Sequence, residues 1–227
     1  MAHTYNFLPS QRKTVETCVL QAQAALDKAY KNMLALQRKG VAGTLIADYE
    51  RWFGTFGPKN LARVTEVIGL MDFALNSGRI TFEYNQGCGA TTNAVAFTPT
   101  HGWKTAKLKE TLQSGTFRIS LCPRFFGAMP QDAQDRQSRT GTFIHELSHI
   151  VGNTNDIAQN HLGGAPITDA PAGFTFYGRD AARLLADRFP NFAIENAENY
   201  GFYATWIMRS TATEEVDLSG AFTQLFG

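Results

Sequence analysis

The stretch His145-Glu146-Leu147-Ser148-His149 decides how this sequence is read. It lies in an apolar run from Thr142 to Val151, whose composition predicts a helix. In a helix, residues four apart share one face, so the two imidazoles would converge on one point. Two neutral imidazole nitrogens at this spacing suit Zn²⁺, and the carboxylate of Glu146 would stand where it can take a proton from a metal-bound water.

The alternative for this stretch is an ordinary amphipathic helix that carries two exposed or hydrogen-bonded histidines. Apolar residues lie on more than one side of the segment, which predicts a helix inside the protein body rather than on its surface. Burying two imidazoles and a carboxylate is costly unless something pairs with them, and a metal ion is the simplest partner. We therefore predict that His145 and His149 are metal ligands.

Size and charge narrow the class of protein. The chain has 227 residues, of which 44% are hydrophobic and 18% charged, enough for one domain or for two lobes around a cleft. We predict a single domain over residues 1–227, with an N-terminal lobe of about 1–152 and a C-terminal lobe of about 153–227. With a net charge of +1 and no apolar run of membrane-spanning length, we expect neither nucleic acid as a partner nor insertion into a membrane. The sequence does not indicate an oligomeric state.

Two features bear on the compartment. Residues 1–7 lack the basic region and the apolar stretch of a secretory signal. We expect a protein that is secreted or delivered outside the cell by a signal-independent route, with a cytoplasmic location as the alternative. Cys88 and Cys122 both lie at strand-like segments, where they would form one disulfide or stay free, whereas Cys18 is expected to be a buried thiol in a helix.

Periodicity predicts a mostly helical chain with a small sheet. Helical spacing of apolar residues covers Pro9–Gly40, the segment around Trp52 and Phe53, Asn60–Asn76, Arg179–Arg188 and Asn191–Met208. Short β-prone segments occur at Ile80–Tyr84, Ala94–Phe97 and Phe117–Cys122. We therefore predict an α+β fold in which a small sheet with an antiparallel edge precedes a cleft that holds the His-Glu-x-x-His helix. An edge strand there can hold an extended peptide.

A catalytic zinc generally has three protein ligands and keeps a fourth position for water. The candidates nearest to the two histidines are Asp156, His161 and Asp169. The helix is expected to end at Gly152, and Asp156 lies close enough beyond it for the chain to turn back onto the metal. The alternative for Asp156 is an ordinary turn residue in a loop rich in Asn, Thr and Asp.

Together these segments resemble the deuterolysin-type, or aspzincin, metalloendopeptidases, which include the peptidyl-lysine enzymes. The family pattern is a His-Glu-x-x-His helix followed by a Gly-Thr-x-Asp-like segment, and Thr154-Asn155-Asp156 matches its Thr-x-Asp core. Further segments follow in the family's order: Arg51–Gly54, Ile119–Phe126, Tyr177-Gly178 with Ala181–Ala186, and Asn196–Tyr200.

This resemblance implies a zincin-like metalloprotease fold, one Zn²⁺ per chain, and a protein or peptide as the substrate. It implies hydrolysis by a metal-activated water with Glu146 as general base and Asp156 as third ligand. Asp169 is the substitute ligand, since it lies inside an insertion of roughly 157–174 that departs from the family pattern.

The resemblance also suggests roles for two residues nearer the C-terminus. It implies that Tyr177 donates a hydrogen bond to the developing oxyanion, with simple aromatic packing as the alternative. It implies that Glu198 binds a basic substrate residue after the cleaved bond. Gly201 stands where a second acid would be expected, so strict preference for lysine is not predicted.

Two other functions fit the same motif. One is a non-catalytic binding or interaction module that zinc stabilises, although Glu146 argues against it because a structural site needs no base. The other is a metal-dependent hydrolase of a non-peptide amide, which the motif chemistry does not distinguish from a peptidase.

Overall fold

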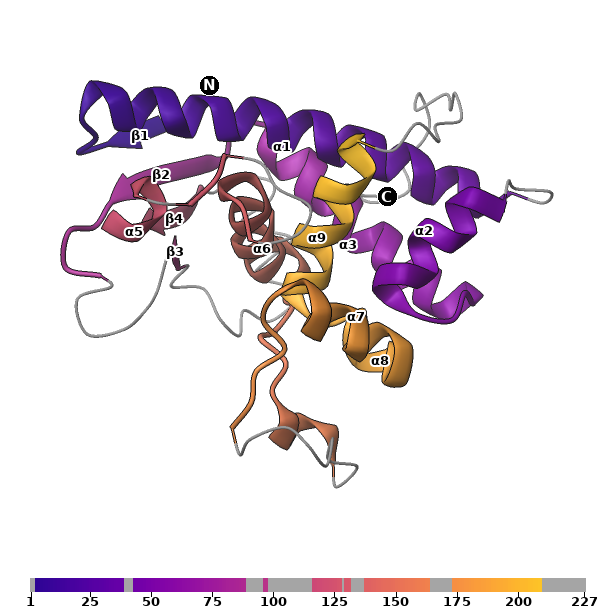
Figure 1. The fold of residues 1–227 in the computed structure, drawn as a ribbon. Helices are drawn as coiled ribbons and strands as arrows, with labels where there is room; N and C mark the ends of the chain where they lie inside the picture. The colour runs from indigo at the N-terminus through magenta and orange to yellow at the C-terminus, as the bar shows by residue number, and fades with distance from the viewer. Residues whose placement is uncertain are drawn as a thin grey trace.

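The computed structural model describes residues 3–38, 43–88, 96–97, 116–127, 129–131, 137–163 and 173–209. Over these ranges the chain is mostly helical and carries one small sheet (Figure 1). None of the described helices combines the length and the hydropathy that a membrane span needs.

Three helices form the first half of the body: α1 (Pro9–Leu36), α2 (Gly43–Phe53) and α3 (Pro58–Asn76). α1 and α3 each begin with a proline at the first helical position, where its missing N–H group has no partner to lose. The three helices predicted from apolar periodicity are confirmed, and α1 ends at Leu36, a few residues before the predicted stop at Gly40.

Four short strands form one sheet in the order β1-β2-β4-β3. They are β1 (His3–Tyr5), β2 (Ile80–Tyr84), β3 (Ala96–Phe97) and β4 (Phe117–Leu121). β1, β2 and β4 are parallel, with Phe82 opposite Ile119, and β3 pairs antiparallel with β4. The sequence predicted neither the parallel centre of this sheet nor the strand at its N-terminal edge.

The second half of the chain is helical with irregular connections. Its elements are α5 (Pro123–Phe126), α6 (Arg139–Gly152), the 3₁₀ helix η1 (Gln159–Leu162), α7 (Arg179–Arg188), α8 (Pro190–Ala193) and α9 (Ala197–Arg209). The single helix predicted over Asn191–Met208 is therefore wrong, because residues 194–196 interrupt it. The interruption lets Asn196 form a backbone bridge with Asn155.

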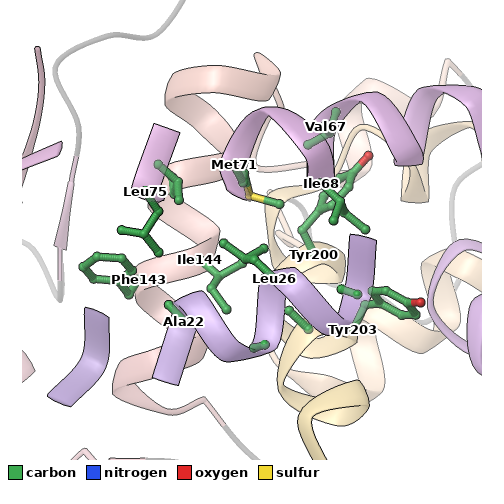
Figure 2. Packing of buried hydrophobic residues seen from close by; sticks show 14 of the residues in the cluster. Ala22, Leu26, Val67, Ile68, Met71, Leu75, Phe143, Ile144, Tyr200 and Tyr203 are labelled. Atoms are coloured by element: carbon green, nitrogen blue, oxygen red, sulfur yellow. The ribbon is translucent and has the colours of Figure 1, made fainter. Parts of the chain in front are cut away.

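The main hydrophobic core surrounds α6, which lies between the sheet and α9 (Figure 1). Figure 2 shows Phe143 and Ile144 of α6 among side chains of α1, α3 and α9. The Phe143 ring also lies 4.8 Å from the ring of Phe82, so the sheet packs on the same helix. Full burial of such a side chain contributes roughly 1.5–3 kcal/mol. The prediction that this helix lies inside the protein is confirmed.

Two further features complete the fold. A disulfide joins Cys88 to Cys122, linking the ends of β2 and β4, while Cys18 is a buried free thiol. A second, smaller hydrophobic cluster lies beyond α6 and contains Ile157, Leu162, Phe176, Leu185, Ala186 and Ala193. The division into two lobes at about residue 152 stays a prediction.

Candidate metal centre

Capping interactions fix both ends of α6. At its start, Ser138 Oγ accepts a hydrogen bond from the backbone N–H of Gly141, 3.1 Å away. At its end, Asn153 adopts a left-handed conformation with φ 52°, which asparagine tolerates better than most residues. The family pattern has glycine at this position, and asparagine is one of the few other residues that adopt this conformation readily.

The two histidines converge as their helical spacing predicted. His145 Nε2 and His149 Nε2 lie 3.1 Å apart, and the two rings are almost perpendicular. His145 is 7% exposed and His149 is 3% exposed. Both histidine side chains are therefore buried, with little access to water.

Asp156 completes a group of three potential metal ligands. Its Oδ1 atom lies 3.2 Å from His145 Nε2 and 3.4 Å from His149 Nε2. His161, the second candidate, instead uses its Nδ1 atom to accept a hydrogen bond from the backbone N–H of Ala158. Asp169, the substitute candidate, lies outside the described residues.

Hydrogen bonds behind the rings determine which nitrogen carries the proton. His149 Nδ1 donates to the carbonyl oxygen of Thr154 at 2.8 Å, and His145 Nδ1 donates to Glu198 Oε2 at 2.9 Å. When each ring is neutral, as a metal ligand must be, Nδ1 carries the proton and Nε2 keeps its lone pair. Both Nε2 atoms lie next to the carboxylate of Asp156, so the bonds to Thr154 and Glu198 hold them where they can bind a cation.

The donor set fits a tetrahedral zinc site. With Zn²⁺ bonds of about 2.0–2.1 Å, ligand atoms lie about 3.3–3.4 Å apart. The three separations between His145, His149 and Asp156 range from 3.1 to 3.4 Å. Asp156 Oδ1 is buried and accepts no hydrogen bond from the described part of the chain, which leaves it available to a cation.

The protein groups alone make this position favourable for positive charge. Burial would lower the pKa of His145, but Asp156, Glu198 and Glu146 raise it well above its ordinary value. Burial would raise the pKa of Asp156, but the two histidines hold it well below its ordinary value. Both shifts favour a negative carboxylate that faces a positive charge.

Glu146 is the third member of the motif and lies on the same helix as both histidines. It is 7% exposed. Burial raises the pKa of its carboxyl, and the two histidines oppose that shift.

Backbone pairing holds the segment that carries Asp156. The N–H of Asn155 donates to the carbonyl of Glu195 at 2.7 Å, and the N–H of Ala197 donates to the carbonyl of Asn155 at 3.0 Å. On the other side, the N–H of Ile157 donates to Asn196 Oδ1 at 3.1 Å. The chain is thus fixed immediately before and after Asp156.

The side chain of Asn199 extends this support to two further helices. It accepts a hydrogen bond from Asn196 Nδ2 and donates to the carbonyls of Trp52 and Ala182. These contacts connect two of the segments that carry the family resemblance, around Trp52 and from Asn196 to Tyr200. Both segments were identified from the sequence, but the hydrogen bonds between them were not predicted.

Arg63 is a supporting residue that sequence reasoning missed. Its guanidinium donates to both oxygens of Glu195, at 2.9 and 2.7 Å, and to the carbonyl of Gly152 at 2.6 Å. Arg63 therefore joins the end of α6 to the segment that pairs with Asn155. No local signal marks it, because Glu195 lies 132 residues away in the sequence.

Pairing between the two arms of the insertion brings Tyr177 close to Asp156. The N–H of Phe176 donates to the carbonyl of Ile157, and the N–H of Gln159 donates to the carbonyl of Phe174, so the two arms of the insertion pair. Figure 1 shows that η1, which belongs to this insertion, lies away from the other helices.

The side chain of Tyr177 is 48% exposed, and its ring centre lies 6.1 Å from that of His145. Its hydroxyl contacts Asp156, and burial together with that carboxylate raises the pKa of the phenol.

The predicted role of Glu198 in substrate binding stays a prediction. The residue is 4% exposed, and its Oε2 atom lies behind the His145 ring, 2.9 Å from Nδ1. Its other oxygen accepts hydrogen bonds from Gln137 Nε2 and from the backbone N–H of Gly178, both at 2.8 Å. Glu198 is buried because it lies on the side of α9 that packs against α6, where the two helices cross closely.

Comparisons with known proteins agree with the resemblance inferred from the sequence. The model of the lysine-specific metallo-endopeptidase (aspzincin) family matches residues 40–205. The chain is 30% identical over 203 residues to a peptidyl-Lys metalloendopeptidase of Armillaria mellea, covering 88% of this chain and 46% of that protein. It is 25% identical over 158 residues to an extracellular protease of Aeromonas hydrophila, covering 69% and 35% respectively. The chain thus spans less than half the length of these relatives.

The fold resembles that of a zinc peptidase from Grifola frondosa, with a TM-score of 0.60 and 20% sequence identity over 88% of this chain and 96% of that one. At this identity the likeness shows the fold alone. The family match covers most of the chain, and the cluster of His145, His149 and Asp156 offers the donor set that zinc requires. The chain therefore belongs to the lysine-specific metallo-endopeptidase (aspzincin) family, which uses zinc.

Proposed function

We propose that the protein is a zinc endopeptidase that hydrolyses peptide bonds of protein or peptide substrates. The observation that carries this proposal is the convergence of His145 Nε2, His149 Nε2 and Asp156 Oδ1 within 3.1–3.4 Å of one another, beside Glu146. Family membership supports the same activity. These three atoms are the proposed zinc ligands, and a fourth position remains for water. The chemistry supplied by bound Zn²⁺ is acidification of that water and polarisation of the scissile carbonyl.

Glu146 is the proposed general base. A base must accept a proton from water and release it to the leaving amine, which works best when its pKa lies near the working pH. Burial raises the pKa of Glu146 in that direction. In the His-Glu-x-x-His motif its carboxylate stands next to both proposed ligands, within reach of the attacking water.

Tyr177 is the proposed donor to the oxyanion. Its hydroxyl contacts Asp156, and its raised pKa keeps the phenol protonated as a hydrogen-bond donor. The ring is half exposed beside His145, so a substrate carbonyl has room to approach it. Packing alone would favour the full burial seen for the neighbouring Phe176.

We also propose a substrate cleft along α6 and a place of action outside the cell. β3 lies at the edge of the sheet and contacts α6, so an extended substrate can add to it as a further strand. The disulfide between Cys88 and Cys122 suits an oxidising compartment, and the Aeromonas relative is named an extracellular protease. The route of export stays a prediction.

Digestion of denatured casein tests the proposal. The zinc-loaded protein is expected to cleave casein, a chelator to stop cleavage, and added zinc to restore it. The variant Glu146→Gln keeps the shape of the side chain but cannot act as a base, so it should bind one zinc and lose about 100- to 10,000-fold in rate. A zinc-loaded Glu146→Gln variant with unchanged activity would remove Glu146 from this role. Absence of cleavage by the parent protein would instead favour a binding module or a hydrolase of another amide.

A further inference from the structure

The carboxylate of Glu198 connects two parts of the site that lie far apart in the sequence. Oε2 accepts a hydrogen bond from His145 Nδ1 at 2.9 Å. Oε1 accepts from the backbone N–H of Gly178 and from Gln137 Nε2, each at 2.8 Å. One side chain therefore contacts a proposed zinc ligand and the residue that follows Tyr177.

Each contact has a consequence for the geometry of the site. The bond to Nδ1 orients the His145 ring and holds its Nε2 atom 3.2 Å from Asp156 Oδ1. The bond to Gly178 holds the turn after Tyr177, where φ is 85° and a glycine is favoured. Losing the carboxylate would loosen the His145 ring and the Tyr177 turn together.

The surroundings of Glu198 leave little of its carboxylate for a substrate. Three of its roughly four acceptor positions are engaged, one at Oε2 and two at Oε1, and the residue is 4% exposed. A second acid has no room one turn further along α9, because a Cβ at Gly201 would lie 2.7 Å from the carbonyl oxygen of Gly141. Glu198 and uncharged residues, among them Ser138, Thr142 and Phe202, line a small pocket at this place, with room for about one water molecule.

We propose that Glu198 is a positioning residue that holds His145 and the Tyr177–Gly178 turn in register, and that it does not bind the substrate's side chain. This inference rests on the proposed peptidase function. It follows that the residue after the cleaved bond is not selected through Glu198, and that any preference for lysine arises elsewhere.

The variant Glu198→Gln tests this proposal with two independent measurements. The amide keeps the size of the side chain but offers one acceptor oxygen where the carboxylate offers two, so it cannot serve both sets of donors. We expect zinc affinity, measured by competition with a chelator, to fall by about 10- to 100-fold. At saturating zinc we expect cleavage of a peptide library to fall by the same factor at basic and neutral sites. The exposed acid on α1, in the variant Glu16→Gln, is the charge-matched control and should change neither quantity.

Two outcomes would overturn the proposal: zinc affinity equal to that of the parent, or a loss of cleavage confined to sites before lysine and arginine. If Glu198→Gln does not fold, the variant Glu198→Asp takes its place. Its shorter carboxylate keeps the charge but reaches fewer partners, so zinc affinity should still fall by about 10-fold while site preference stays constant. The zinc measurement does not depend on catalysis, so failure of the peptidase proposal remains distinguishable from failure of this one.

Discussion

His145 Nε2 and His149 Nε2 lie 3.1 Å apart, and the hydrogen bond on the far side of each ring turns both atoms toward Asp156 Oδ1. Without a metal, the raised pKa of His145 keeps a proton at this point, facing the negative carboxylate of Asp156. A bound cation would take the place of that proton, with both rings neutral and both Nε2 lone pairs directed at it. The three atoms therefore favour positive charge between them, and zinc competes with protons for the site.

Zinc is expected to raise the thermal stability of the protein. A ligand that binds the folded state alone stabilises it by about 2.7 kcal/mol when its free concentration is 100-fold above Kd. Calorimetry of the chelator-treated protein with and without added Zn²⁺ measures the effect. The melting temperature should rise with zinc concentration in the parent protein and hardly change in the double variant His145→Ala/His149→Ala. Equal shifts in both proteins would place the zinc elsewhere.

Two matched variants test whether Asp156 or Asp169 is the third zinc ligand. Asp156→Asn replaces the anionic ligand atom with a neutral amide, so we expect zinc affinity to fall by at least 10-fold, measured by chelator competition. Asp169→Asn makes the same chemical change within the insertion and should leave the affinity unaltered. The reverse order of effects would make Asp169 the third ligand.

Arg63 is expected to matter for stability well beyond a surface charge. Arg63→Met removes two hydrogen bonds to Glu195 and one to the carbonyl of Gly152, so the free energy of unfolding should fall by about 1–3 kcal/mol. The matched control is Glu66→Gln, which removes the exposed partner of the same arginine and should cost less than about 0.5 kcal/mol. Both values come from urea denaturation. Equal losses would show that the contacts with Glu195 and Gly152 add nothing.

The buried carboxyl of Asp72 is expected to make the free energy of unfolding depend on pH. Burial, with the nearby charge of Asp27, raises its pKa to about 6, and contacts with Asn76 and Lys31 oppose the shift only in part. Below about pH 3 the carboxyl is protonated in the folded and unfolded chains alike. As the pH rises toward 6 the unfolded chain loses this proton first, so stability falls and then stays lower above pH 6.

The variant Asp72→Asn should remove this cost, which is of the order of 3 kcal/mol at neutral pH. Its free energy of unfolding should match that of the parent near pH 3 and exceed it at pH 7, as measured by urea denaturation at each pH. Glu16→Gln, which removes an exposed carboxylate, controls for net charge. A difference between variant and parent that stays constant across this range would contradict the raised pKa.

The parts of the site that depend on local sequence could be predicted, and the parts that depend on contacts across the fold could not. The spacing of His145 and His149 fixes their convergence through helix geometry alone. Asp156 was predicted through the family resemblance, and the backbone pairing of Asn155 with Glu195 and Ala197 holds its segment in place. The role of Glu198 depends on a contact between two helices across 53 residues. Sequence resemblance placed Glu198 in the site, but the close crossing of α6 and α9 decides which way its carboxylate faces.

The same contrast between local sequence patterns and contacts across the chain applies to the fold. Apolar periodicity identified α1, α2 and α3, because each buries a stripe that repeats with the helical period. A continuous apolar run identified α6, which is buried from Phe143 to Gly152. The parallel pairing of β1 with β2 joins His3 to Thr81, and no local pattern encodes such a register. Likewise, the break between α8 and α9 follows from the backbone pairing of Asn155 with Asn196, not from the residues at the break.

Anomalous X-ray scattering at the zinc edge, from crystals of the zinc-loaded protein, tests the central claim most directly. We predict one peak within about 2.0–2.2 Å of His145 Nε2, His149 Nε2 and an Asp156 oxygen, with a water in the fourth position. A zinc peak elsewhere in the molecule, or one whose coordination omits either histidine, would contradict the account.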